Sequence, residues 1–249
     1  MEMYKKKKNF KKKILIIIPA RSGSKRIPNK NIKLLNRKPL IYYTIKYALK
    51  ENKNARVIVS TDSKEIANLS VKFGAETPFL RSKYLSKDNT LDYPVIKDCL
   101  INLKKIDNYI PEYLIYLRPT QPFRVDGEIA KAIKILKTNP STDSVRTVQH
   151  NKYPPFWMKK IDKKNNLVSL EKKYQKFSDI RSQDLPITYF CDGAIDASNV
   201  KSYIKLKSFS KGNVYGLLRE NLQYVDIDKE DDWAYAEYLM KTKKANKAK

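Results

Sequence analysis

The apolar and polar positions in the first quarter of the chain follow the pattern of a βαβ unit. Residues 14–18 are five consecutive apolar residues between lysines and Pro19, which predicts a strand buried on both faces of a parallel sheet. Residues 40–50 repeat apolar positions at helical spacing, and residues 56–60 predict a second short buried strand. A long polar loop, residues 20–39, joins the first strand to the helix.

The same alternation continues for another 75 residues. One helix is predicted from residue 62 or 63 to 73, and a second has its apolar positions between residues 95 and 103. Residues 113–117 predict a strand, and residues 129–136 carry the apolar face of a further helix. Strands that alternate with helices predict an α/β fold with a mostly parallel, doubly wound sheet.

The pattern changes between about residues 140 and 188. Lysine, asparagine and serine become frequent, and short β-like pieces occur around Val145, Trp157 and Val168. We expect this β-rich segment to leave the main sheet as an extension. The later elements are three strands and one helix, predicted at residues 189–195, 213–218, 224–227 and 233–240.

Length and charge bound the organisation of the chain. A chain of 249 residues, 41% of them hydrophobic, suits one α/β domain, which we place at residues 14–240. A lysine-rich leader, residues 1–13, and a lysine-rich tail, residues 241–249, are expected to lie outside that domain and to be solvated. They account for part of the net charge of +26, and +15 remains on residues 14–240. Such a surface attracts a nucleotide, an acidic sugar or RNA alike, so charge does not choose between them.

Cysteine and histidine are too few for several kinds of chemistry. Cys99 and Cys191 exclude a disulfide framework and are compatible with a reducing compartment, and His150 is the sole histidine, in a polar stretch without a nucleophile motif. The apolar run after the leader is only five residues long, which is too short for a signal peptide or a membrane span. We therefore expect a soluble cytoplasmic protein that does not associate with membranes.

The loop Ala20-Arg21-Ser22-Gly23-Ser24-Lys25-Arg26-Ile27-Pro28-Asn29-Lys30-Asn31 carries the strongest candidate chemistry. It follows the carboxyl end of the first strand, where open α/β sheets bind ligands. Gly23 lets backbone N–H groups approach an anion, and Arg21, Lys25 and Lys30 can share the charge of a triphosphate. The glycine spacings of a P-loop and of a dinucleotide fingerprint are absent. On these residues alone, a solvated basic loop remains the alternative.

A second candidate is the pair Asp226 and Asp228. In Val225-Asp226-Ile227-Asp228 the two-residue period of a strand turns both carboxylates to one face, where they can bind a hard cation such as Mg²⁺ together with phosphate oxygens. The alternative is that these two residues, with Asp231 and Asp232, only supply negative charge at the start of the last helix.

The sequence as a whole resembles the acylneuraminate cytidylyltransferases, which are the CMP-sialic acid synthetases and their legionaminic and pseudaminic relatives. The resemblance covers most of residues 14–240. It rests on the first loop and Val225-Asp226-Ile227-Asp228, together with motifs that occur between them: Val59-Ser60-Thr61-Asp62, Leu80-Arg81, Asp88, Arg118-Pro119-Thr120-Gln121-Pro122-Phe123-Arg124, Gln183-Asp184-Leu185-Pro186 and Asp192-Gly193-Ala194-Ile195.

This resemblance implies a Rossmann-like nucleotidyltransferase and a homodimer whose subunits exchange contacts through the β-rich segment. It makes Asp226 and Asp228 the ligands of Mg²⁺, for which Mn²⁺ can substitute. The residues that it implies around the CTP phosphates are Arg21, Ser24, Lys25, Lys30 and Asn31, and those near the nucleotide are Arg81 and Asp88.

The implied sugar pocket departs from the pattern of the family. Arg118 stands where the family has a Gln, and Gln121 replaces a Ser, so the resemblance does not identify the sugar. An Arg can pair bidentately with the carboxylate of the sugar, or it can reshape the pocket for another substituent. The residues implied for sugar binding are Arg118, Thr120, Gln121, Arg181 and Gln183.

The implied reaction is attack by the anomeric hydroxyl of a nine-carbon 2-keto-3-deoxy sugar acid on the α-phosphate of CTP, with release of pyrophosphate. Arg21, Lys30 and Asp228 are the predicted catalytic residues, and either a metal-bound water or Asp228 takes the proton. A 3-deoxy-octulosonate cytidylyltransferase, a basic RNA-binding protein without catalysis and a degenerate fold kept for assembly are the alternatives. Most tyrosines fall at core-like positions, so nucleic acid is not an expected partner.

Overall fold

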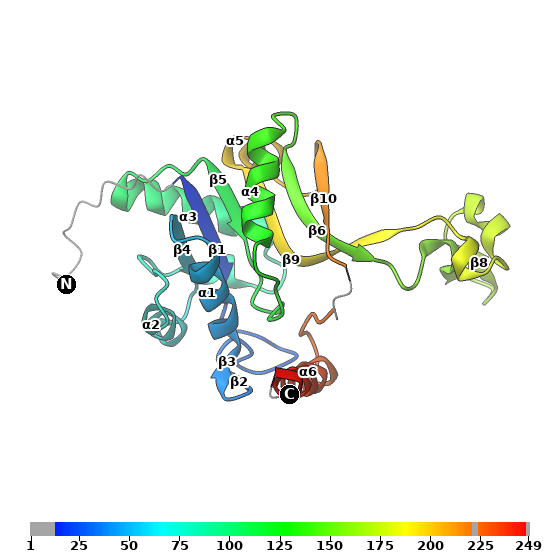
Figure 1. The fold of residues 1–249 in the computed structure, drawn as a ribbon, viewed down its shortest axis with the longest axis horizontal. Coiled ribbons are helices and arrows are strands. Elements are labelled where there is room, and N and C mark those ends of the chain that lie inside the picture. The colour runs from blue at the N-terminus through cyan, green and yellow to red at the C-terminus, as the bar shows by residue number, and fades with distance from the viewer. Residues whose placement is uncertain (1–12, 221–223, 248–249) are drawn as a thin grey trace.

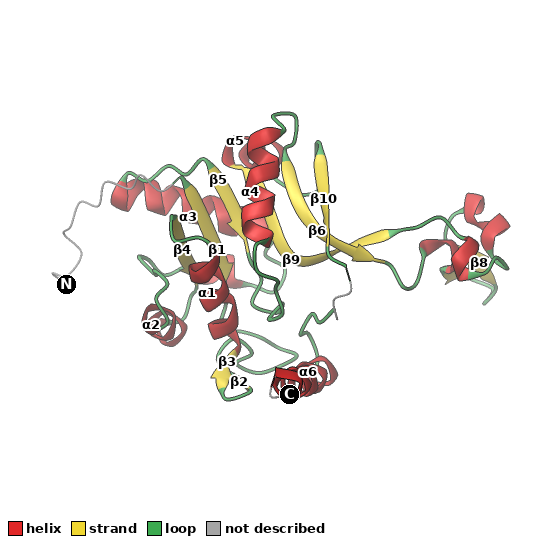
Figure 2. Cartoon of the chain, viewed as in Figure 1, coloured by secondary structure: helices red, strands yellow, loops and turns green. Residues whose placement is uncertain are grey.

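The computed structural model describes residues 13–220 and 224–247. Its centre is a six-stranded sheet in the order β10-β6-β9-β5-β1-β4, with helices on both faces (Figures 1 and 2). The sheet strands are β1 (Ile14–Pro19), β4 (Ala55–Ser60), β5 (Tyr113–Tyr116), β6 (Ser144–His150), β9 (Tyr189–Asn199) and β10 (Val214–Leu218). The predicted mostly parallel sheet is confirmed, with β9 as the strand that runs antiparallel to both of its neighbours, β5 and β6.

Strand β1 shows why the sheet is covered on both faces. Its side chains alternate: Ile16 and Ile18 join a core with helices α1 and α4, whereas Leu15 and Ile17 join a second core with α3 and α5. All four side chains are fully buried, as an uninterrupted apolar strand requires. The helices are α1 (Leu40–Glu51), α2 (Lys64–Lys72), α3 (Asp92–Asp107), α4 (Glu128–Thr138), α5 (Val200–Leu206) and α6 (Glu230–Lys247).

Helix α6 packs away from the sheet, below the loop that follows β1 (Figure 1). A third core joins Trp233 and Leu239 of α6 to Ile27 of that loop and to Leu35 of the short hairpin β2 (Leu34–Leu35) and β3 (Lys38–Pro39). The helix begins three residues earlier than the predicted 233–240 and continues to Lys247, into the segment predicted as a tail. Residues 1–12 of the predicted leader and residues 248–249 lie outside the described residues.

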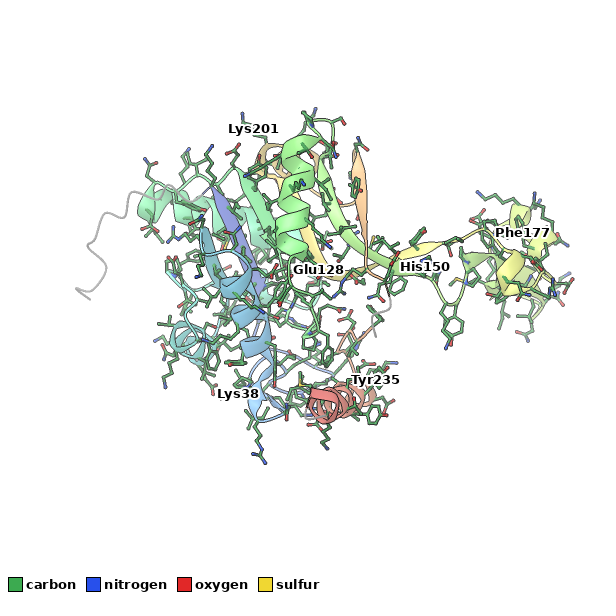
Figure 3. All side chains as sticks on the ribbon, viewed as in Figure 1. Lys38, Glu128, His150, Phe177, Lys201 and Tyr235 are labelled. Carbon is green, nitrogen blue, oxygen red and sulfur yellow. The ribbon has the colours of Figure 1, made fainter. Side chains whose placement is uncertain are left out.

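The segment between β6 and β9, residues 151–188, projects from the domain as an arm (Figure 1). It consists of the small hairpin β7 (Lys159–Ile161) and β8 (Leu167–Ser169) and of three short 3-10 helices, Pro155–Trp157, Lys172–Phe177 and Ser182–Asp184. The arm extends from His150 at its base toward Phe177 at its far end (Figure 3). We call residues 151–188 the arm from here on.

Two sequence expectations need correction. The predicted extension begins near residue 140, but β6, which contains Val145, pairs with β9 and β10 inside the main sheet, so the chain leaves the sheet only after His150. The predicted strand at 224–227 is also wrong: this segment pairs with no strand among the residues that the structure describes. It is tied to the domain by the Ile227 N–H, which donates to the Thr120 carbonyl at 3.0 Å. Its apolar residues, Val225 and Ile227, are buried against α6, which accounts for the strand-like alternation.

A β-bulge marks the middle of β9. The pairing register between β6 and β9 shifts between Arg146 and Val148, where Thr147 hydrogen-bonds to both Asp192 and Ile195. Gly193 in the bulge has a φ of 72°, a backbone conformation that residues with a side chain rarely adopt. This explains why a glycine follows Asp192.

Candidate active site

The carboxyl ends of β4, β1 and β5 lie at one edge of the sheet because the three strands are parallel neighbours. Open α/β sheets bind ligands in a crevice outside the carboxyl ends of their strands. A cleft of about 570 Å³ lies there. It brings together ten of the residues predicted from the sequence, Arg21, Ser24, Lys25, Lys30, Asn31, Arg81, Asp88, Arg118, Thr120 and Asp228.

The loop after β1 is fixed to the domain at several points. The Asn31 side chain donates to the Arg21 carbonyl at 2.9 Å, and Ile27 is fully buried. The backbone N–H and the hydroxyl of Ser22 both donate to the carboxylate of Asp62, at 2.9 and 2.7 Å. Burial alone would raise the pKa of Asp62, but the hydrogen bonds from Ser22 outweigh it and lower that pKa.

Two cations of the loop are paired with Asp88, a carboxylate of the same chain that also lines the cleft. Arg21 forms an ion pair with Asp88, and the Lys25 ammonium lies 2.7 Å from the other oxygen of the same carboxylate. Hydrogen bonds from Lys25 and Arg21 lower the pKa of Asp88. Asp88 thus occupies a position suited to an anionic oxygen, which marks where a phosphate group can bind.

Lys30 joins the loop to the segment before α6. Its ammonium donates to the Ile227 carbonyl at 2.7 Å and to Asp228 at 3.0 Å, and its side chain is 14% exposed. Arg26 lies 3.4 Å from the second oxygen of Asp228. The basic loop and the aspartate pair, almost 200 residues apart in the sequence, are therefore parts of one site.

Asp226 and Asp228 differ in environment. Asp228 lines the cleft, whereas burial raises the pKa of Asp226, and a hydrogen bond with Thr120 opposes that rise. The charge of Asp228 raises the pKa of Asp226 further, so the two carboxylates are close enough to repel each other. A divalent cation would relieve this repulsion. Two carboxylates completed by phosphate oxygens fit the habits of Mg²⁺, although no group of three or more ligand-type side chains occurs in the described residues.

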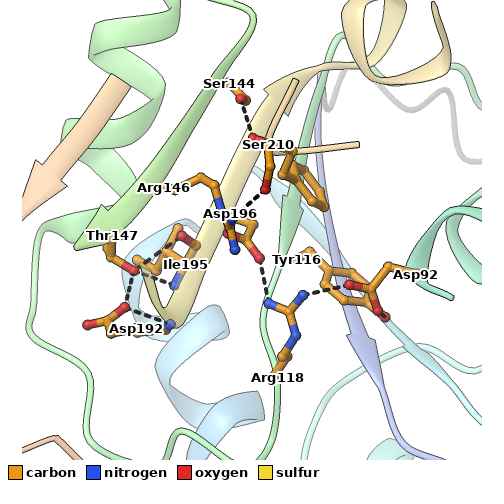
Figure 4. A network of polar contacts seen from close by, with 12 residues as sticks. Asp92, Tyr116, Arg118, Ser144, Arg146, Thr147, Asp192, Ile195, Asp196 and Ser210 are labelled. Atoms are coloured by element: carbon orange, nitrogen blue, oxygen red, sulfur yellow. Dashed lines mark hydrogen bonds and ion pairs between the residues drawn. The ribbon is translucent and has the colours of Figure 1, made fainter. Parts of the chain in front are cut away.

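Arg118, at the end of β5, lies at the floor of the cleft in a network of charged groups (Figure 4). It donates to Asp92 at 2.6 Å and to Asp196 at 2.5 Å, and the Tyr116 hydroxyl donates to Asp92 at 3.0 Å. Burial would lower the pKa of Arg118, but the charges of Asp196 and Asp92 outweigh it and raise that pKa. Arg118 is therefore a permanent cation whose charge is balanced inside the chain.

The other residues predicted for sugar binding do not line this cleft. Gln121 is 3% exposed, beneath the cleft surface. Arg181 and Gln183 are on the arm, where Arg181 pairs with Asp184 at 2.9 Å and Gln183 lines a cavity of about 180 Å³ beside His150. Within one chain the structure does not bring Arg181 and Gln183 together with Arg118 and Thr120, whereas the Gln121 N–H donates to the Arg118 carbonyl at 3.2 Å.

Several residues of the site were missed as site residues. Asp62 could have been recognised, because it follows the carboxyl end of the second predicted strand. Asp92 and Asp196 gave no such signal, since one begins a helix and the other lies inside a strand. Only the fold brings them to Arg118.

The fold and the cleft together define a nucleotide-binding α/β protein, with a fixed basic loop at the crevice of the sheet. The chain belongs to the cytidylyltransferase family, because the model of that family, described as Cytidylyltransferase, matches residues 15–211. The predicted family resemblance is confirmed.

Relatives with known names agree with this assignment. The chain is 38% identical, over 92% of its length and 96% of the relative, to a CMP-N,N'-diacetyllegionaminic acid synthase of Legionella pneumophila. It is 30% identical to an N-acylneuraminate cytidylyltransferase of Escherichia coli, over 94% of this chain but 54% of the relative, so it spans about half of that protein.

A solved structure supports the fold alone, because its sequence identity is only 14%. It is a CMP:2-keto-3-deoxy-manno-octonic acid synthetase complexed with CTP, which superposes with a TM-score of 0.65 over 93% of this chain and 99% of the other. The fold is therefore one used by CTP-dependent nucleotidyltransferases.

Proposed function

We propose that the protein transfers CMP from CTP to a nine-carbon 2-keto-3-deoxy sugar acid of the neuraminate, legionaminate or pseudaminate type. The observation that carries the proposal is the cleft, in which the basic loop after β1 faces Asp228 across the carboxyl end of the sheet. The named relatives, which include a legionaminic acid synthase of nearly the same length, support the class of sugar.

Each substrate has a place in this scheme. Arg21, Lys25 and Lys30 bind the β- and γ-phosphates of CTP, with the triphosphate displacing Asp88 from Arg21 and Lys25. The anomeric oxygen of the sugar forms a bond with the α-phosphorus, and pyrophosphate leaves with the electron pair of the broken P–O bond. Lys30 and Arg21 neutralise the charge that develops on the leaving pyrophosphate.

Asp226 and Asp228 are the proposed ligands of Mg²⁺. When bound, Mg²⁺ would supply further charge neutralisation at the phosphates. In the present structure Lys30 and Arg26 balance the charge of Asp228. The hydroxyl proton must also be accepted. Asp228 is our candidate, since His150 lies at the base of the arm and does not line the cleft.

A direct assay tests this function. Pyrophosphate release from CTP would be measured with and without Mg²⁺, against a panel of sialic, legionaminic, pseudaminic and octulosonic acids. We expect Mg²⁺-dependent turnover with at least one nine-carbon acid and little with the eight-carbon acid. The absence of turnover with every acid of the panel would contradict the proposal.

We further propose a homodimer formed through the arm. The arm exposes large apolar side chains, including Ile161 at 68%, Leu167 at 73% and Ile187 at 71%, which a second copy can cover. Dimer formation would let Arg181 and Gln183 reach the sugar in the cleft of the other copy. Light scattering should then give the mass of two chains, and Arg181→Ala should raise the KM for the sugar acid about tenfold without changing that for CTP. A monomeric mass would contradict the dimer.

The tyrosines at the core-like positions do not support the RNA-binding alternative. Tyr113 and Tyr116 are buried in the core, and the hydroxyls of Tyr43 and Tyr47 donate to backbone carbonyls. These rings are therefore not available as a stacking surface.

Among the described residues, none of the helices combines the length and apolar character needed to span a bilayer. We propose a cytoplasmic location, where CTP is made.

A further inference from the structure

Arg118 does not present a free positive charge to the cleft. One of its terminal nitrogens donates to Asp196, which is 1% exposed, and the other donates to Asp92, which is 42% exposed. Asp196 also accepts from Arg146 at 2.6 Å, so two guanidinium groups and two carboxylates form one chain of ion pairs (Figure 4). The network therefore contains two positive and two negative charges.

This balance makes Arg118 a poor receptor for the carboxylate of a sugar acid. An incoming carboxylate would either displace Asp92 or lie beside it, and two like charges at short range repel each other. Displacing Asp196 would leave a buried charge only partly compensated, which is costly. The bidentate role that the sequence suggests for Arg118 therefore has a competitor already in place.

Arg118 nevertheless keeps hydrogen-bonding capacity. A guanidinium has five N–H donors, and one from each terminal nitrogen is used in the bonds to Asp196 and Asp92. The guanidinium also lies over the Tyr116 ring, with its carbon 5.1 Å from the ring centroid. Two carboxylates and an aromatic ring thus fix its orientation at the cleft floor.

Asp92 is complementary to Arg118 in this respect. Its carboxylate accepts one hydrogen bond from Tyr116 and one from Arg118, although a carboxylate can accept about four. It lines the cleft and is nearly half exposed. Asp92 and Arg118 therefore offer an acceptor beside donors, with no net charge between them.

We propose that Asp92 and Arg118 form a specificity-determining pair that recognises a neutral polar group with a hydrogen-bond donor next to an acceptor, rather than a carboxylate. This inference rests on the proposed function, under which two groups have that chemistry. One is the edge of the cytosine base, where an amino group adjoins a ring nitrogen. The other is the acylamino or hydroxyl group of the sugar. Arg146 and Asp196 act through Arg118 as positioning residues.

The test is Asp92→Asn, which keeps the shape of the side chain but places an N–H₂ donor where a carboxylate oxygen can accept a hydrogen bond. Binding of CTP and of each sugar acid in the panel would be measured separately by calorimetry, and KM for both substrates would be measured in the active pair. We expect the affinity for one substrate to fall on the order of 10- to 100-fold, because a hydrogen bond to a charged group is lost. The affinity for the other substrate should be unchanged.

The substrate affected identifies the group recognised. Weaker binding of CTP assigns the pair to the cytosine edge, and weaker binding of the sugar acid assigns it to the sugar. Arg118→Gln, which removes most of the donors, should weaken the same substrate. Asp126→Asn is the matched control, since Asp126 forms an exposed ion pair with Lys50 and does not line the cleft. Asp92→Ser repeats the test if Asp92→Asn lowers the melting temperature.

Two outcomes would overturn the proposal. One is unchanged binding of CTP and of every sugar acid in Asp92→Asn. The other is tighter sugar binding in Asp92→Asn together with weaker sugar binding in Arg118→Gln, which would make Arg118 a carboxylate receptor and Asp92 its competitor. Because calorimetry needs no turnover, failure of the proposed reaction appears separately, as a wild-type protein that binds substrates without releasing pyrophosphate.

Discussion

The loop after β1 and the arm after β6 are two irregular segments that carry predicted binding residues, yet they are stabilised differently. The loop is joined to the domain through Ile27, Asn31 and Lys30, and its cations face into the cleft. The arm is held by its own hairpin and 3-10 helices and exposes apolar side chains such as Leu167. One chain thus builds the proposed phosphate side of the site alone, whereas the arm exposes apolar surface that the second copy of the proposed dimer can cover.

The largest expected effect concerns the anchoring of the loop. Ile27→Ala removes a fully buried side chain from the core with α6 and should lower the free energy of unfolding by about 2–5 kcal/mol. Ile161→Ala on the arm, where the side chain is 68% exposed, should cost less than about 0.5 kcal/mol in the monomer. Urea unfolding at low protein concentration measures both. Equal losses in the two variants would remove the contrast between loop and arm.

Lys30→Met tests the charge of the loop rather than its packing. Methionine keeps an unbranched apolar chain but loses the ammonium that binds Ile227 and Asp228. We expect kcat/KM for CTP to fall about 100-fold or more, because a positioned charge acts directly on the phosphates. Lys176→Met, at an exposed arm lysine that lies over the Phe177 ring, is the matched control and should leave kcat/KM for CTP unchanged. A similar loss in both would mean that net charge, not position, governs the rate.

The smallest expected effect is the pH dependence of the hydrogen bonds that Ser22 of the loop donates to Asp62, which follows β4. The pKa of Asp62 is lowered in the folded protein, so its contribution to stability is present above the unfolded pKa of about 3.8 and is lost as pH falls through the lowered value. Because the Asp62 carboxylate is partly exposed to solvent, which screens its charge, we expect only a few tenths of a kcal/mol. Asp62→Asn should flatten this part of the acid stability profile, measured by thermal unfolding between pH 2 and about 5. An unchanged profile would show that the bonds from Ser22 do not contribute.

Local patterns in the sequence predicted the parts of the fold that depend on neighbouring residues. Strand β1 and helix α1 follow from an apolar run and from helical spacing, and the loop between them was recognised because it follows a strand end. The basic loop and Asp228 were paired only through the family resemblance, and the structure places them in contact. The start of the extension was misplaced because β6, like the arm, contains several polar residues, and its strand partners lie far along the chain.

The partners of Arg118 could not be predicted from local pattern. Asp92 is 26 residues away from Arg118 and Asp196 is 78 residues away. Their proximity depends on the order of strands in the sheet, which periodicity does not encode. The sequence could identify Arg118 as a departure from the family, but the way its charge is balanced required the fold.

Strand β9 connects the floor of the cleft to the base of the arm, since it carries Asp196 near one end and Tyr189, paired with His150, at the other. In a strand, insertion or deletion of one residue reverses the face of every side chain beyond it. An insertion between these positions would therefore turn Asp196 away from Arg118 or reorient the arm. The composition of the cleft floor and the direction of the arm are thus coupled through the register of a single strand.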